Sequence, residues 1–364
     1  MTDLDERAQK DAGVETLRGL AVLMMVAGHV VGADASSGLR VPDDSGWRHA
    51  YYTLVPLRMP LFTAISGFVY AMRPVRAGQL GAFAAGKLRR LLLPLLTIGL
   101  AFVLLRQVTP GVNTPLRPED LPWLLVIPYA HFWFVYALAW ILLLVGALDA
   151  YGLLDTRARW VLVLAGAFSL MASGLLATPV LGIGRAQHLL PYFLLGLGVG
   201  RFGFARDHTT ALALAGLGAI GLIGHQGAWF GWWQLEGLRG YLTTSLLGSV
   251  AVVLLLARRR AWRPLAALGA FSYGIYLMHV FGTAGARIVL QRAGIESVPV
   301  LAIAGLSAGL ALPIAVERFA APRPRLAMLL LGRRPRPPME YIPHAFAPPA
   351  PSQGNPPTVV TPPT

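Results

Sequence analysis

The chain has 364 residues, of which 55% are hydrophobic and 13% charged, about half the 25% charged content of a typical soluble protein. It contains no cysteine, which excludes disulfides, a thiolate nucleophile, an iron–sulfur site and a cysteine-bound metal. The formal net charge of +14 does not indicate a nucleic-acid partner, because the basic residues stand in short loops between apolar runs.

Apolar runs of about 20 residues, the length that crosses a bilayer, recur along the whole chain. They predict an all-α polytopic membrane protein with about ten transmembrane helices. The predicted spans are 17–33, 51–72, 91–106, 121–148, 159–178, 187–203, 209–225, 240–257, 264–288 and 298–318.

The two ends of the chain differ from this membrane domain, which we place at 17–326. Residues 1–16 are polar and partly acidic, unlike a cleavable signal peptide, and are predicted to form a cytoplasmic segment. Residues 327–364 are rich in proline, which predicts a disordered cytoplasmic tail. A polyproline segment that binds a partner is the alternative for this tail.

Lysine and arginine follow the alternation of the spans. Most of them fall in the two ends of the chain and in every second loop, such as 73–90 and 258–263. Basic loops remain in the cytoplasm, so both termini are predicted inside and residues 34–50 outside. We expect a multi-pass protein of the plasma membrane.

The first span contains "LRGLAVLMMVAGHVVG", residues 17–32, with Arg18 at one end and His29 well inside. On a helix the two side chains share a face, about 16 Å apart along the axis. This places Arg18 at the cytoplasmic mouth and His29 near mid-membrane. Arg18 can be read as an interfacial anchor, and His29 as a histidine satisfied by a neighbouring helix. Together they indicate a cofactor with an anionic end in the cytoplasm and a reactive end in the membrane.

Two further stretches carry polar or aromatic residues inside apolar spans. In "SYGIYLMH", Ser272, Tyr276 and His279 share one helical face, which must point to the interior of the bundle. This stripe is either functional or a set of interhelical hydrogen bonds. In "HFWFVY", residues 131–136, we interpret Trp133 and Tyr136 as aromatic-belt or core residues.

Arg58 precedes "MPLFTAISGF" at a depth similar to that of His29, where it needs an internal partner or an anion. Within that stretch Ser66 and Gly67 are small enough to allow close contact between helices.

The stretch "GKLRRLLLP" places Lys87, Arg89 and Arg90 directly before the third span. The positive-inside rule explains most of this charge.

Six stretches occur in an order that resembles the acyltransferase-3 family of integral membrane O-acyltransferases. They are "LRGLAVLMMVAGHV", "MPLFTAISGF", "KLRRLLLP", "HFWFVY", "LGAFSYGIYLMH" and "VERFAAPRPR". The resemblance covers about residues 14–326. It implies ten core helices, and it matches His29 to the essential histidine and Arg18 to the essential arginine of the family.

The chain departs from the family in two places. An Arg-x-x-Arg pair of many members corresponds to Lys87 and Arg90, so an ammonium replaces the first guanidinium and its forked phosphate contact. The serine-hydrolase-like domain of longer members has no counterpart, so we expect the short, standalone type.

The resemblance implies a cytoplasmic acyl-CoA donor, with acetyl or another short acyl group, and a hydroxyl acceptor on a cell-envelope carbohydrate or glycolipid. We predict that Arg18, Lys87, Arg89 and Arg90 hold the CoA phosphates. We predict His29 as general base, with Arg18, Arg58, Ser66, Tyr276 and His279 as further catalytic candidates. No metal and no nucleic-acid partner are expected; membrane lipid is the remaining expected partner.

Three alternatives remain at this point. An acyl-histidine intermediate is the rival to direct transfer. The acceptor can instead be a macrolide or another secondary metabolite. A transporter or flippase of a lipid-linked sugar would use the polar stripes as a path without acyl transfer.

Overall fold

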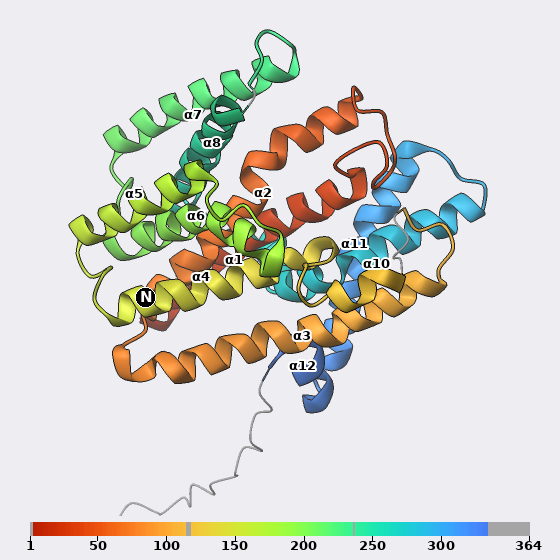
Figure 1. Ribbon diagram of the computed structural model, residues 1–364, viewed down its shortest axis with the longest axis horizontal. Helices are drawn as coiled ribbons and strands as arrows, with labels where there is room; N and C mark the ends of the chain where they lie inside the picture. Colours follow the sequence, from red (N-terminus) through yellow and green to blue (C-terminus); the bar gives the residue numbers. More distant parts are fainter. Residues whose placement is uncertain (1–2, 114–117, 236, 334–364) are drawn as a thin grey trace, which may run out of the picture.

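The computed structural model describes residues 3–113, 118–235 and 237–333. Within these residues every regular element is helical (Figure 1). The predicted spans correspond to α1 (Asp3–Val31), α2 (Gly46–Ala71), α3 (Leu80–Val108), α4 (Trp133–Ala150), α5 (Arg157–Ser173), α6 (Ile183–Phe202), α7 (His208–Trp229), α8 (Gly237–Ala257), the pair α9 (Arg263–Gly269) and α10 (Ser272–Arg292), and α11 (Val298–Ala320).

The predicted class, an all-α polytopic membrane protein, is confirmed. By length and composition, seven described helices can cross a membrane, and α9 with α10 makes an eighth if this pair, bent by 80°, is one span. The two predicted spans that fall short of this are α5, with 17 residues, and α6, whose first turns carry Arg185, Gln187 and His188. Of the ten predicted spans, seven or eight are therefore supported as membrane-crossing helices.

Small residues let α2 and α6 pack with their backbones in contact. A Cβ atom at Gly67 would collide with the carbonyl oxygen of Phe193, and one at Gly196 would collide with that of Ala64. The expected close helix contact at Gly67 is confirmed. In lipid, such close van der Waals packing takes the place of the hydrophobic drive between helices.

The helix ends agree with the predicted alternation of spans. Where α1, α3 and α10 end, Asn113 donates to the carbonyl of Gly38 at 3.0 Å, and Arg287 donates to that of Gly111 at 3.1 Å. Where α3 and α10 begin, Tyr273 donates to the carbonyl of Arg90 at 2.7 Å. The start of α1 and the end of α11 lie on this second side, which the arginine distribution predicts to be cytoplasmic.

The residues directly after the last span form a helix, where the sequence predicts the start of a disordered tail. Helix α12 (Pro324–Leu331) lies under α3 (Figure 1), buries Ala327 and Leu331, and accepts a hydrogen bond from Thr97 at the carbonyl of Leu329. The first residues of the predicted tail, from 327, are thus helical and packed, because their leucines find an apolar face on α3. The remainder, 334–364, lies outside the described residues.

The orientation can be tested with single cysteines in this cysteine-free chain. Ser36 and Gln79 are both exposed and lie at opposite ends of the bundle. We expect Ser36→Cys to react with a membrane-impermeant thiol reagent in whole cells, and Gln79→Cys to react only after the membrane is opened. The reverse pattern would invert the predicted topology.

Candidate functional site

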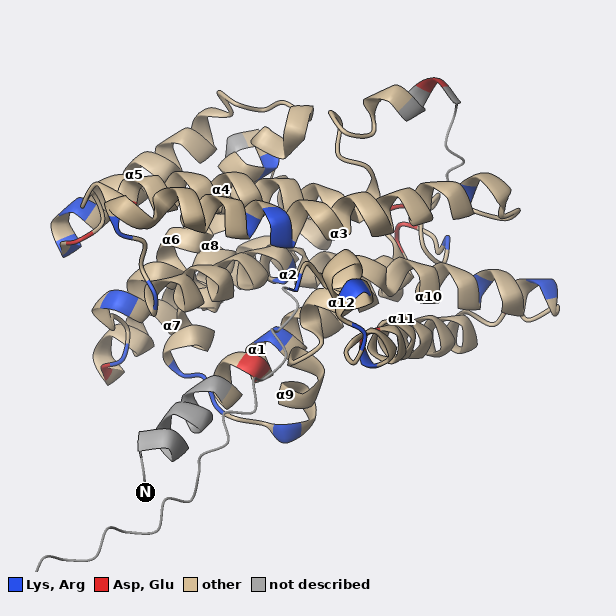
Figure 2. Ribbon diagram, turned by 90° about the horizontal axis from the view of Figure 1, so that it is seen from below, with Lys and Arg blue, Asp and Glu red and all other residues tan. Residues whose placement is uncertain are grey.

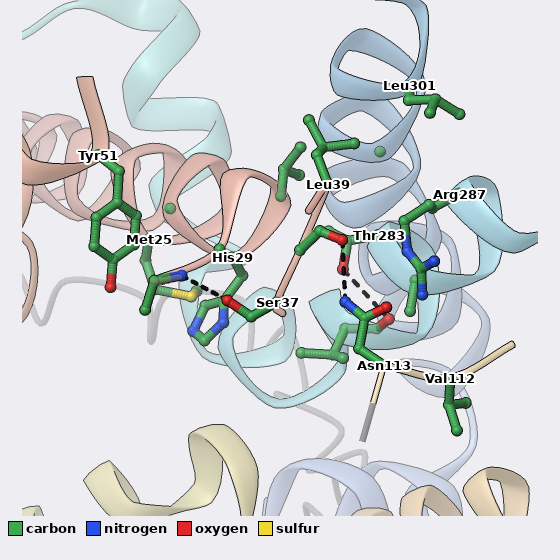
Figure 3. A pocket seen from close by; sticks show the side chains of 18 of the residues that line it. Met25, His29, Ser37, Leu39, Tyr51, Val112, Asn113, Thr283, Arg287 and Leu301 are labelled. Atoms are coloured by element: carbon green, nitrogen blue, oxygen red, sulfur yellow. Dashed lines mark hydrogen bonds between the residues drawn. The ribbon is translucent and has the colours of Figure 1, made fainter. Parts of the chain in front are cut away.

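A cavity of about 390 Å³ lies at the end of the bundle where α1, α3 and α10 end. Its walls come from these helices, from α2, α4 and α11, and from the chain that follows α1 and α3. Figure 3 shows the imidazole of His29 beside Met25 and Ser37, with Asn113, Thr283 and Arg287 across the cavity. The ring of His29 is exposed to this space although helices surround it.

Three histidines from separate segments meet at the cavity wall. The ring of His29 lies 4.7 Å from that of His279 and 6.2 Å from that of His131, centroid to centroid. His131 and His279 lie 4.8 Å apart. His279 and His131 are fully buried, at 0% and 3% exposure, so His29 alone of the three presents its ring to the cavity.

The hydrogen bonds of the two buried histidines indicate which ring nitrogen of each carries a proton. Nε2 of His131 lies 3.1 Å from the carbonyl of Leu277, and Nδ1 of His279 lies 2.9 Å from the carbonyl of Tyr276. A carbonyl only accepts, so in the neutral form of each imidazole these nitrogens carry the proton. Nδ1 of His131 and Nε2 of His279 are then lone pairs, buried and without a hydrogen-bond partner among the described residues.

This arrangement can orient a base. If one N–H of His29 donates a hydrogen bond to the lone pair of His279, the other nitrogen of His29 carries a lone pair that can face the cavity. Within the described residues, no group of three or more His, Cys, Asp or Glu side chains is arranged to hold a metal ion.

Arg58 lines the same cavity as His29, so the structure brings these two predicted site residues together. Its guanidinium carbon lies 4.2 Å from the ring centroid of Tyr51. A Cβ atom at Gly28 would overlap the guanidinium. Glycine at this position thus lets Arg58 approach α1 directly beside His29.

Two other predicted catalytic residues lie outside the cavity. The hydroxyl of Tyr276 donates to the backbone carbonyl of His131, so Tyr276 holds that segment and does not reach the reacting space. Ser66 donates to the carbonyl of Phe62 in its own helix at 3.0 Å. His279 is at the site, but behind His29.

The predicted phosphate-binding residues lie away from the cavity. Arg18 pairs with Glu15, and Lys87 and Arg90 lie 5.2 Å and 5.9 Å from the rings of Phe83 and Tyr273. Along α3, Lys87 is about 28 Å from Arg106, which does line the cavity. His29 is in the last turn of α1, nearer to the end of the helix than the predicted mid-membrane position.

Sequence reasoning missed several cavity residues: His131 as a neighbour of His29, and Arg106, Arg287 and Trp133 as lining residues. The signal for His131 was present, because it begins "HFWFVY", where only the later aromatic residues were weighed. Arg106 and Arg287 stand at the ends of the predicted spans 91–106 and 264–288, where no role was predicted for them. Only folding shows that these helix ends converge on His29.

Comparison with known proteins adds the family. The family described as an acyltransferase domain matches residues 11–318, which include the three histidines and all four predicted phosphate-binding residues. No curated protein and no solved structure matches the chain significantly. A match over most of the chain, together with the membrane-spanning helices and a cavity-facing histidine, shows that this chain belongs to the acyltransferase-3 family and is a multi-pass membrane acyltransferase.

Proposed function

We propose that the protein transfers an acyl group, acetyl or another short acyl, from cytoplasmic acyl-CoA to a hydroxyl of a cell-envelope carbohydrate or glycolipid. The supporting observation is the position of His29. It faces the cavity at one end of the bundle, while Arg18 on the same helix marks the opposite, basic end. The two are about 16 Å apart along the axis, a distance that an extended pantetheine arm can bridge.

His29 would act as a general base in this reaction. It takes the proton of the acceptor hydroxyl while the hydroxyl oxygen bonds to the thioester carbon. The tetrahedral intermediate then breaks its carbon–sulfur bond, and the CoA sulfur leaves with the proton that His29 held. Base catalysis of this kind contributes about 10²–10⁴-fold.

Arg58 would stabilise the negative oxygen of that intermediate. Its guanidinium lies beside Gly28, which precedes His29, and both side chains line the cavity. A fixed positive group in a site of low polarity stabilises developing charge more than water does. Ser66 and Tyr276, which bond to backbone carbonyls elsewhere, have no part in this proposal.

The donor end supports the same proposal. Lys87, Arg89 and Arg90 succeed one another along α3, where α12 packs, and the Nε of Arg89 is buried without a hydrogen-bond partner among the described residues. Guanidinium groups can bind two phosphate oxygens at once.

The reaction can be measured by the release of CoA thiol. Because the chain has no cysteine, a thiol-reactive dye reports only free CoA. We expect purified protein to release CoA from acetyl-CoA when an envelope glycolipid is present, with the acetyl group recovered as an ester of that lipid. Release with a macrolide but with no envelope lipid would assign the acceptor to secondary metabolism.

For donor binding, we expect Arg90→Ala to weaken acyl-CoA binding about tenfold, because it removes a charged phosphate contact. Added salt should weaken binding to the unchanged protein, since exposed charges are screened. Arg260→Ala is the matched control, because Arg260 is an exposed arginine in a loop that is also predicted to be cytoplasmic. Equal losses for both variants, by calorimetry in detergent, would contradict a phosphate site at Arg90.

A further inference from the structure

We propose that the cavity binds an acceptor that carries an anionic group, a phosphate or a carboxylate, close to the hydroxyl that is acylated. That the ligand is the acyl acceptor rests on the proposed function. The preference of the cavity for anions does not, because it follows from the arginines that line it.

Three helices each contribute one arginine to the cavity: Arg58 from α2, Arg106 from α3 and Arg287 from α10. No aspartate or glutamate is among the described residues that line it. The ion pairs found in the described part of the chain use other arginines. In Figure 2 the acidic residues, drawn red, are few and lie in loops, near helix ends and within α1. The cavity therefore has an uncompensated positive charge.

Two of these guanidinium groups lie against aromatic rings. Arg58 lies over Tyr51 at 4.2 Å, and Arg106 lies 5.6 Å and 5.1 Å from the rings of Phe102 and Tyr129. The Nε atoms of both arginines are buried and have no hydrogen-bond partner among the described residues. Contact with a ring face fixes the plane of a guanidinium and leaves its N–H edge for another ligand.

Arg287 has a different role at the same wall. It is 6% exposed and donates to Gln291 at 2.9 Å and to the carbonyl of Gly111 at 3.1 Å, so it holds the chain after α3 in place. Arg40 adds further positive charge at this edge, because its Nε donates to Asn113, which lines the cavity, at 3.0 Å.

Buried charge without a partner is costly, and arginine in particular matches the two oxygens of a carboxylate or phosphate. Water in the cavity can solvate one such group. Two guanidinium groups that line the same cavity as the proposed base, with no aspartate or glutamate among the described residues of its lining, fit a ligand whose anionic group anchors it while its hydroxyl reaches His29.

The charge preference can be measured without any activity. Val112 lines the cavity, and Ser36 is an exposed residue of the loop after α1. In purified, full-length Val112→Cys protein, we would compare the reaction rates of a sulfonate and a trimethylammonium methanethiosulfonate. Relative to the same ratio at Ser36→Cys, we expect the sulfonate to be favoured by about tenfold. Adding Arg58→Gln or Arg106→Gln should remove most of this preference, and Arg58→Lys should retain it.

Ligand protection then tests the chemical class. Glucose 6-phosphate or glucuronate should slow modification of Val112→Cys, whereas glucose at the same concentration should not. Vesicles of phosphatidylglycerol and of phosphatidylcholine separate a lipid phosphate from a soluble one. Equal protection by glucose, or a reagent ratio that ignores both arginine substitutions, would overturn the proposal. If the preference for the sulfonate reagent is present but the protein transfers no acyl group, the proposed function alone would be overturned.

Discussion

His29→Gln is expected to lower acyl transfer by about 100-fold or more while the protein still folds, enters the membrane and binds acyl-CoA. Glutamine retains the size and hydrogen bonding of the side chain but cannot accept a proton at neutral pH. Since His29 lies in the cavity and Arg18 is about 16 Å away along α1, donor binding should be unaffected. CoA release and acyl-CoA binding, measured on the same preparation, separate the two.

The matched control is His188→Gln. His188 is another histidine within a helix of the membrane domain, with one hydrogen bond at 2.8 Å to Tyr241, and it lines a separate cavity. His279→Gln is not a neutral control, because its ring contacts that of His29. Transfer by the His29→Gln protein at a rate near that of the unchanged protein would return His29 to a structural role.

The pH profile follows from the same assignment. A general base acts only when unprotonated, so transfer should decline as the pH falls and the imidazole of His29 takes up a proton. One titrating group should describe this acid limb. A transfer rate that stays constant as the pH is lowered, down to the pH at which the protein unfolds, would contradict a histidine base.

Gly67→Leu is expected to prevent stable folding, because a side chain there meets the backbone of α6 at Phe193 and cannot move aside. We expect a loss of about 3 kcal/mol or more, seen as a large drop in thermal stability in detergent or as a failure to accumulate. Gly166→Leu on α5 is the control. Nothing lies within 4 Å of a Cβ atom at Gly166, so that variant should be as stable as the unchanged protein. Similar losses for both would mean that α2 and α6 are not in such close contact.

The sequence by itself determined the class of protein and two of the residues that line its cavity. Apolar runs of bilayer length and few charges can only be satisfied by helices that hydrogen-bond internally. A histidine and an arginine within such runs stand out because burying them is costly. This is why His29 and Arg58 were found from the sequence, and why both line the cavity. Gly67 was found for a similar reason, since a small residue in a span marks close packing.

The tertiary structure decided which residues share the site. Ser66 has the hydroxyl that a catalytic serine needs, yet this hydroxyl donates to the carbonyl of Phe62 in its own helix. The sequence cannot distinguish a serine that bonds within its helix from one that faces a cavity. His131 and Arg106 belong to segments that periodicity cannot place relative to α1, because contacts between helices join residues far apart in the chain. The sequence does not predict helix α12 within the tail, because a helix of eight residues is not stable alone and forms here by packing on α3. Local pattern thus predicts the helices, whereas the convergence of their ends on His29 depends on packing that no single segment encodes.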